Sequence, residues 1–111
     1  MARGLPERLA AKYAAGKATS FQAELLASLL LEMAGQTVRT VCAAGRLPWR
    51  ELDDAIQETT IRCLARMDTF SHQKASLKTW CSAISRRICA DMARKLTKEA
   101  TIPLDDKEQE L

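Results

Sequence analysis

The chain has 111 residues, 47% of them hydrophobic and 5% aromatic, with four glycines, three prolines and a net charge of +3. This length holds one domain and excludes most multi-domain enzymes, and the scarcity of aromatic and turn-forming residues favours an all-α fold over a β-sandwich or barrel. The sequence contains neither an apolar run long enough to span a membrane nor a secretory signal, so we expect a cytoplasmic protein without a membrane partner.

Two helices are predicted in the amino-terminal third of the chain. Apolar residues spaced four apart predict a short amphipathic helix that opens near Pro6 and stops at Gly16. Thr19 and Gln22 have the spacing of a capping box, in which each side chain bonds the backbone N–H of the other residue. The apolar face that follows predicts a long helix over about 20–44.

Two more helices follow, each predicted from a single apolar stripe at helical spacing. The third is expected over about 48–67 and the fourth over about 76–95. The stretch 68–76 between them is polar and breaks the periodicity, so it is interpreted as a loop. These elements predict a compact bundle of three to four helices.

The last sixteen residues differ from the rest in charge. Residues 96–111 contain two Lys or Arg side chains against five Asp or Glu side chains. Pro103 favours extended backbone there, and few apolar residues are available for burial. We therefore expect a helical domain over 1–95 followed by an acidic linker or tail over 96–111.

The four cysteines, Cys42, Cys63, Cys81 and Cys89, all fall among apolar helix positions. They form no C-x-x-C pair, and His72 is the single histidine, so no zinc-site spacing is present. We predict that all four thiols are small core residues, with a redox role for Cys81 and Cys89 as the alternative. No nucleophile with an orienting base and no phosphate-binding glycine loop is present, so we expect no catalysis, no metal and no cofactor.

One candidate interaction surface lies on the third predicted helix. Asp54, Gln57, Glu58 and Ile61 stand at i, i+3, i+4 and i+7, opposite the apolar stripe. This outer ridge could dock a partner helix. The alternative is a solvated face on which Glu58 only pairs with Arg62 at i+4.

The other candidate surface combines the polar loop with the outer side of the last helix. Residues 62–95 contain eight Lys or Arg side chains and two Asp or Glu side chains, an excess that fits a polyanionic partner and an ordinary basic exterior equally well. Charges on a rigid helix can hold phosphates, and a polar loop can read exposed base edges. The loop residues are Ser71, His72, Gln73 and Lys74, and the helix residues are Lys78, Arg86, Arg87, Arg94 and Lys95.

Several motifs at matching relative spacing resemble the second conserved region of bacterial sigma factors, and the extracytoplasmic-function group most closely. They are Asp54-Ala55-Ile56-Gln57-Glu58-Thr59-Thr60-Ile61-Arg62, Asp68-Thr69-Phe70, Leu77-Lys78-Thr79-Trp80, Ile84-Ser85-Arg86-Arg87-Ile88 and Asp91-Met92-Ala93-Arg94-Lys95. The resemblance implies a helical region 2 domain that joins core RNA polymerase and recognises the −10 promoter element to direct transcription initiation.

The resemblance also implies roles for particular residues. Asp54, Gln57, Glu58 and Ile61, with Arg62 behind them, would meet the clamp helices of the polymerase β′ subunit. Ser71, His72, Gln73 and Lys74 would capture an unstacked base of the −10 element, and Lys78, Arg86, Arg87 and Arg94 would hold the non-template strand. An anti-sigma factor or a separate region 4 protein would be further partners.

Two other functions account for part of the sequence pattern. An interaction-only module would bind the polymerase clamp or a regulatory partner and leave promoter DNA unbound. A helix-turn-helix protein that binds duplex DNA needs a turn of three or four residues between its last two helices, and the stretch 68–76 is too long for that.

Overall fold

The computed structural model describes residues 4–110, with the backbone alone for 100–110. All regular structure in this part of the chain is helical, which confirms the all-α prediction. The elements in chain order are α1 (Leu5–Ala14), α2 (Ser20–Ala43), the 3-10 turn η1 (Trp49–Glu51), α3 (Leu52–Ala65), the 3-10 turn η2 (Met67–Thr69) and α4 (Leu77–Glu110).

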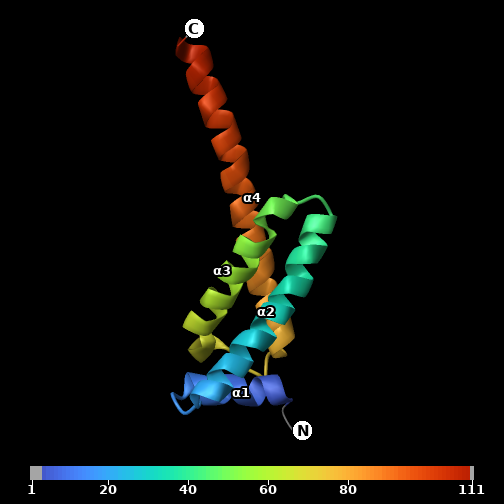
Figure 1. The fold of residues 1–111 in the computed structure, drawn as a ribbon, viewed down its shortest axis with the longest axis vertical. Coiled ribbons are helices and arrows are strands. Elements are labelled where there is room, and N and C mark those ends of the chain that lie inside the picture. Colours follow the sequence, from blue (N-terminus) through green and yellow to red (C-terminus); the bar gives the residue numbers. More distant parts are fainter. Residues whose placement is uncertain (1–3, 111) are drawn as a thin grey trace.

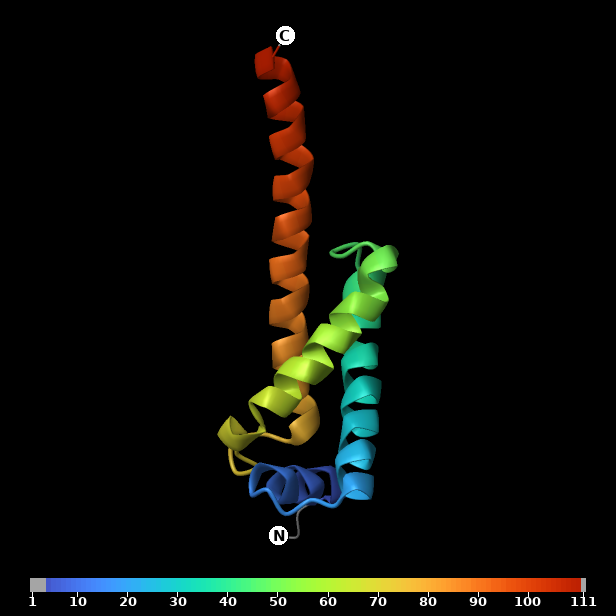
Figure 2. The same ribbon diagram turned by 60° about the vertical axis from the view of Figure 1, so that its left-hand side comes forward.

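The four α-helices form an elongated bundle of 64 × 26 × 23 Å. Helices α2, α3 and α4 each pack against the other two, and α1 crosses one end of the bundle, where it contacts α2, η2 and α4 (Figures 1 and 2). The carboxyl-terminal part of α4 extends beyond the opposite end. None of the helices, as far as the chain is described, combines the length and apolarity that crossing a membrane requires.

Two clusters of buried side chains hold the bundle together. The first lies toward α1 and includes Leu26, Leu30 and Leu77. The second lies toward the α2–α3 connection, is centred on Val38 and Leu47, and has Leu96 at its edge. All four cysteines are buried in these clusters and none forms a disulfide, as predicted for small core residues.

Local signals set the ends of α1 and α2 where the sequence places them. The Thr19 hydroxyl accepts a hydrogen bond from the Gln22 N–H at 3.1 Å, and the Gln22 side-chain oxygen accepts one from the Thr19 N–H at 3.0 Å, so the predicted capping box is present. Gly16 and Gly45 follow the two helices with φ of 71° and 75°. Glycine adopts this left-handed backbone without the steric cost that a Cβ atom would add.

Two predicted helices have different ends in the structure. The third helix is shorter than 48–67, because 3-10 turns replace its two ends. The fourth helix is expected to stop near residue 95 and give way to extended backbone at Pro103. Instead, α4 continues to Glu110. Residues 96–102 contain neither glycine nor proline, so a helix that is already nucleated propagates readily as far as Pro103. The role of residues 96–111 as a linker or tail stays a prediction.

Candidate functional site

The outer ridge lies on the solvent side of α3. Ala55, Thr59 and Cys63 turn inward and are buried. The Thr59 hydroxyl donates to the Ala55 carbonyl at 2.7 Å, so this buried polar group has a hydrogen-bond partner. Asp54, Gln57, Glu58 and Ile61 are exposed, and Ile61 presents 61% of its surface to solvent. An exposed isoleucine among polar side chains is a suitable contact point for a partner.

Glu58 and Arg62 form an ion pair on this helix. The Arg62 guanidinium donates to the Glu58 carboxylate at 3.1 Å, and the two side chains are 50% (Glu58) and 37% (Arg62) exposed. Solvent screens a pair of this kind, which contributes a few tenths of a kcal/mol to stability. The pair holds the two side chains next to each other on the surface of α3. Both remain partly exposed, so a partner can reach them.

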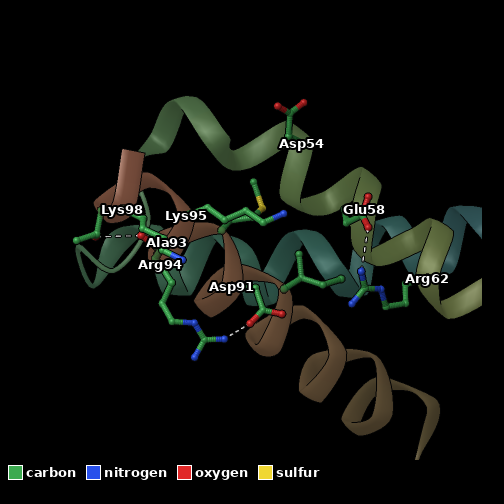
Figure 3. A pocket seen from close by; sticks show the side chains of 11 residues that line it. Asp54, Glu58, Arg62, Asp91, Ala93, Arg94, Lys95 and Lys98 are labelled. Carbon is green, nitrogen blue, oxygen red and sulfur yellow. Dashed lines mark hydrogen bonds and ion pairs between the residues drawn. The ribbon is translucent and has the colours of Figure 1, made fainter. Parts of the chain in front are cut away.

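An open groove of about 1150 Å³ runs between α3 and α4, next to the outer ridge (Figure 3). Its floor includes the apolar residues Ile88 and Met92. The α3 wall carries Asp54, Glu58 and Arg62, and the α4 wall carries Asp91, Arg94, Lys95 and Lys98. The groove therefore has an apolar floor and charged walls, with carboxylates mainly on one side and cations mainly on the other.

The groove divides the residues of the outer ridge. Asp54 and Glu58 line the groove, whereas Gln57 and Ile61 do not. A partner helix that contacts all four must therefore cover the crest of α3 as well as the groove beside it.

The predicted loop forms a closed turn between η2 and α4. The backbone N–H groups of Lys74 and Ala75 donate to the Ser71 carbonyl at 3.1 and 3.3 Å. Ser71 is half-buried, and His72, Gln73 and Lys74 are exposed. The loop thus presents polar donors and acceptors to solvent from a defined backbone.

The base of the loop is fixed to the core by an aromatic contact. Phe70 and Trp80 lie on either side of the loop with ring centroids 5.3 Å apart and planes tilted by 52°. Both rings pack against the first buried cluster. The loop is therefore held at both ends by apolar packing.

The predicted DNA-binding cations of α4 are exposed but do not form one flat patch. At 100° per residue, Arg87 and Arg94 point within about 20° of each other, while Lys78 points about 180° from Arg87. Arg94 also lies about 25 Å along the helix from Leu77, where the loop ends. It pairs with Asp91 and lines the groove, so the structure places Arg94 with the outer ridge and not with the loop.

The sequence analysis did not predict the groove. Ile88 is buried and Met92 packs against the second buried cluster, so both belong to the core, and both also line the groove with Asp91 and Lys98. The groove depends on how α3 and α4 lie against each other, and spacing along one helix carries no information about that arrangement. In the described part of the chain no group of three His, Cys, Asp or Glu side chains is placed to hold a metal ion.

Comparison with known families decides the identity of this bundle. The family model for Sigma-70 region 2 matches residues 30–99, which is more than half of the chain. The chain belongs to the sigma-70 region 2 family. The match includes most of α2, all of α3, the loop and the packed part of α4. No curated protein and no solved structure matches the chain.

Family membership confirms the identification made from the sequence motifs, at the level of the region 2 domain. Region 2 domains act in transcription initiation, where they bind core RNA polymerase and promoter DNA. The general role of this region 2 domain follows from membership.

Proposed function

We propose that this region 2 domain is of the extracytoplasmic-function type, binds the β′ clamp helices of core RNA polymerase and recognises a melted −10 element. The observation that carries the proposal is the position of the motif residues: those with an expected partner are exposed or half-buried, and the apolar residues between them form the core. The polymerase-binding set is Asp54, Gln57, Glu58, Ile61 and Arg62, and the DNA-binding set is Ser71, His72, Gln73, Lys74, Lys78, Arg86, Arg87 and Arg94.

The aromatic residue on α4 packs within the domain. Trp80 is the single aromatic residue in the sequence of this helix, and it packs against Phe70 instead of standing free. Helix α4 therefore has no exposed aromatic ring on which a base could stack. Recognition depends instead on the polar loop and on charge.

The outer ridge and the adjoining groove suit a partner helix of mixed character. Burial of an exposed isoleucine such as Ile61 contributes about 1.5–3 kcal/mol when the fit is complete. Asp54 and Glu58 select basic residues on the partner and steer the encounter. The domain performs no chemistry and uses no cofactor in this proposal.

Titration with single-stranded oligonucleotides tests the DNA half of the proposal. Four phosphate contacts would give a slope of about −3 for log affinity against log salt, at roughly −0.7 per contact on a single strand. Replacement of Arg86 and Arg87 by alanine should make the slope shallower by about 1.4 and weaken binding at low salt. Arg46→Ala, which removes an exposed cation from the α2–α3 connection, is the control and should have a smaller effect.

No binding at low salt, or binding that is indifferent to the loss of Arg86 and Arg87, would refute promoter recognition. That result, combined with intact polymerase binding, would establish the alternative of an interaction-only module. One observation favours this alternative: Arg94, a member of the DNA-binding set, lies in the groove beside the outer ridge. The anti-sigma factor or separate region 4 protein stays a prediction.

A pull-down with core RNA polymerase tests the protein half. Glu58→Ala and Ile61→Ala should each weaken polymerase binding about tenfold, because each removes a contact at the centre of the interface. Glu24→Ala, which removes an exposed carboxylate from α2, should leave binding unchanged. Equal retention of all three variants would show that the polymerase does not use the outer ridge.

A further inference from the structure

A carboxylate from the first helix caps the helix that follows the loop. The Leu77 N–H donates to the Glu7 Oε2 atom at 2.8 Å, across 70 residues of sequence. Leu77 is the first residue of α4, so its N–H has no partner within the helix. A negative charge at this end also interacts favourably with the helix dipole.

A second cap at the same helix end comes from the loop itself. The Ser76 hydroxyl accepts from the Thr79 N–H at 3.1 Å. Glu7 therefore bonds the first helical N–H and Ser76 the third. The bond to Ser76 fixes the turn that leads into α4. The bond to Glu7 ties that turn to α1.

Helix α1 also lies directly beneath the loop (Figure 2). A small cavity of about 50 Å³ separates the two, and its lining includes Glu7 and Ala10 from α1 and Phe70 and His72 from the loop segment. The Leu77 side chain is fully buried below the cap. One side chain of α1 thus touches the point where the loop meets the core.

The backbone before α1 leaves space for this carboxylate. A Cβ atom at Gly4 would lie 2.7 Å from the Glu7 Oε1 atom, closer than real Cβ contacts allow. The φ of Gly4 is −67°, which other residues adopt freely, so a larger residue here would act through the space it takes from Glu7 and not through backbone conformation. An alanine at this position would push the flexible end of Glu7 away from Leu77.

We propose that Glu7 is a positioning residue for base recognition, which ties α1 to the start of α4 and so fixes the loop of Ser71, His72, Gln73 and Lys74. The inference rests on the proposed function of that loop. Glu7 would not touch DNA. Its loss would loosen the loop that discriminates between bases and leave the cations of α4 on an intact helix.

Two measurements on the full chain test this. The first is amide hydrogen exchange at Leu77 and in the loop. The second is affinity for a set of single-stranded oligonucleotides in which each position is varied in turn through the four bases. Glu7→Ala and Gly4→Ala should speed exchange at Leu77 about tenfold and lower the ratio of best to worst affinity by a similar factor. Mean affinity and salt slope of Glu7→Ala should match those of Glu32→Ala, which makes the same charge change on the exposed side of α2, and those of Gly4→Ala should match the wild type.

Glu7→Gln separates positioning from general destabilisation. Its amide oxygen can still accept the bond from Leu77, so this variant should keep most of the discrimination that Glu7→Ala loses. The inference is overturned if Glu7→Ala and Gly4→Ala leave both exchange at Leu77 and base discrimination equal to those of Glu32→Ala. A wild-type chain that binds every oligonucleotide equally would instead overturn the proposed base recognition, and the exchange data would still decide whether Glu7 holds the loop.

Discussion

At the scale of single residues, burial and hydrogen bonding raise the pKa of three of the four thiols. Burial raises the pKa of Cys42, and burial together with the neighbouring Cys42 raises the pKa of Cys89. A hydrogen bond to Cys81 and burial raise the pKa of Cys63. The reactive form of a cysteine is the thiolate, so the folded chain keeps these three groups in their unreactive form.

The raised pKa values predict that the free energy of unfolding falls in alkaline solution. As the pH rises through 9.0, the ordinary value, Cys42 and Cys89 ionise in the unfolded chain but stay neutral in the folded one. Their contribution is complete below that pH and is lost above it. Urea unfolding under reducing conditions at pH 7.5 and 9.5 should show the loss, and a Cys42→Ala/Cys89→Ala chain should show a smaller one. An equal loss in both chains would contradict the assignment.

Two adjacent leucines of α2 provide a matched test of the core. Leu30 is fully buried in the first cluster, whereas Leu31 is 44% exposed. Leu30→Ala should lower the free energy of unfolding by about 2–5 kcal/mol, because it removes buried surface and leaves a cavity. Leu31→Ala should cost less than about 1 kcal/mol. Similar losses in thermal unfolding would mean that α2 is rotated from the position described.

At the scale of elements, the capping box predicts a measurable contribution to α2. Thr19→Ala removes the acceptor for the Gln22 N–H and should cost about 1 kcal/mol of stability. Thr40, in the last turn of α2, is exposed, and its hydroxyl donates to the Gln36 carbonyl of the preceding turn. Thr40→Ala should therefore have little effect, and chemical denaturation of the two variants compares the sites directly.

Elements marked by local signals were predictable, and those set by distant contacts were not. Thr19 with Gln22, and Gly16, mark helix ends within a few residues of sequence, and both signals gave the observed boundaries. The cap from Glu7 to Leu77 joins residues 70 positions apart, so the pattern of neighbouring residues could not predict it. The exposed residues of α3 were predictable from spacing, whereas the groove beside them depends on how two helices cross.

At the scale of the whole molecule, the carboxyl-terminal part of α4 projects beyond the rest of the bundle (Figures 1 and 2). Among the residues whose side chains the structure describes, Leu96 is the last that joins either buried cluster. Removal of residues 100–111 should therefore change the free energy of unfolding by less than about 0.5 kcal/mol. Removal from Met92 onward also takes Met92, Ala93 and Leu96 out of the second cluster and should cost several times more. Equal thermal stability of the two shortened chains would show that the second cluster contributes nothing.

The contact between Glu7 and Leu77 has a practical consequence for handling this protein. Glu7 lies in the first turn of α1, so an affinity tag fused directly ahead of α1 is only a few residues from the carboxylate that secures α4. A tag fused on the far side of α4 leaves α1 untouched. Purification handles and fluorescent labels are therefore best placed beyond α4 whenever nucleic-acid selectivity is to be assayed.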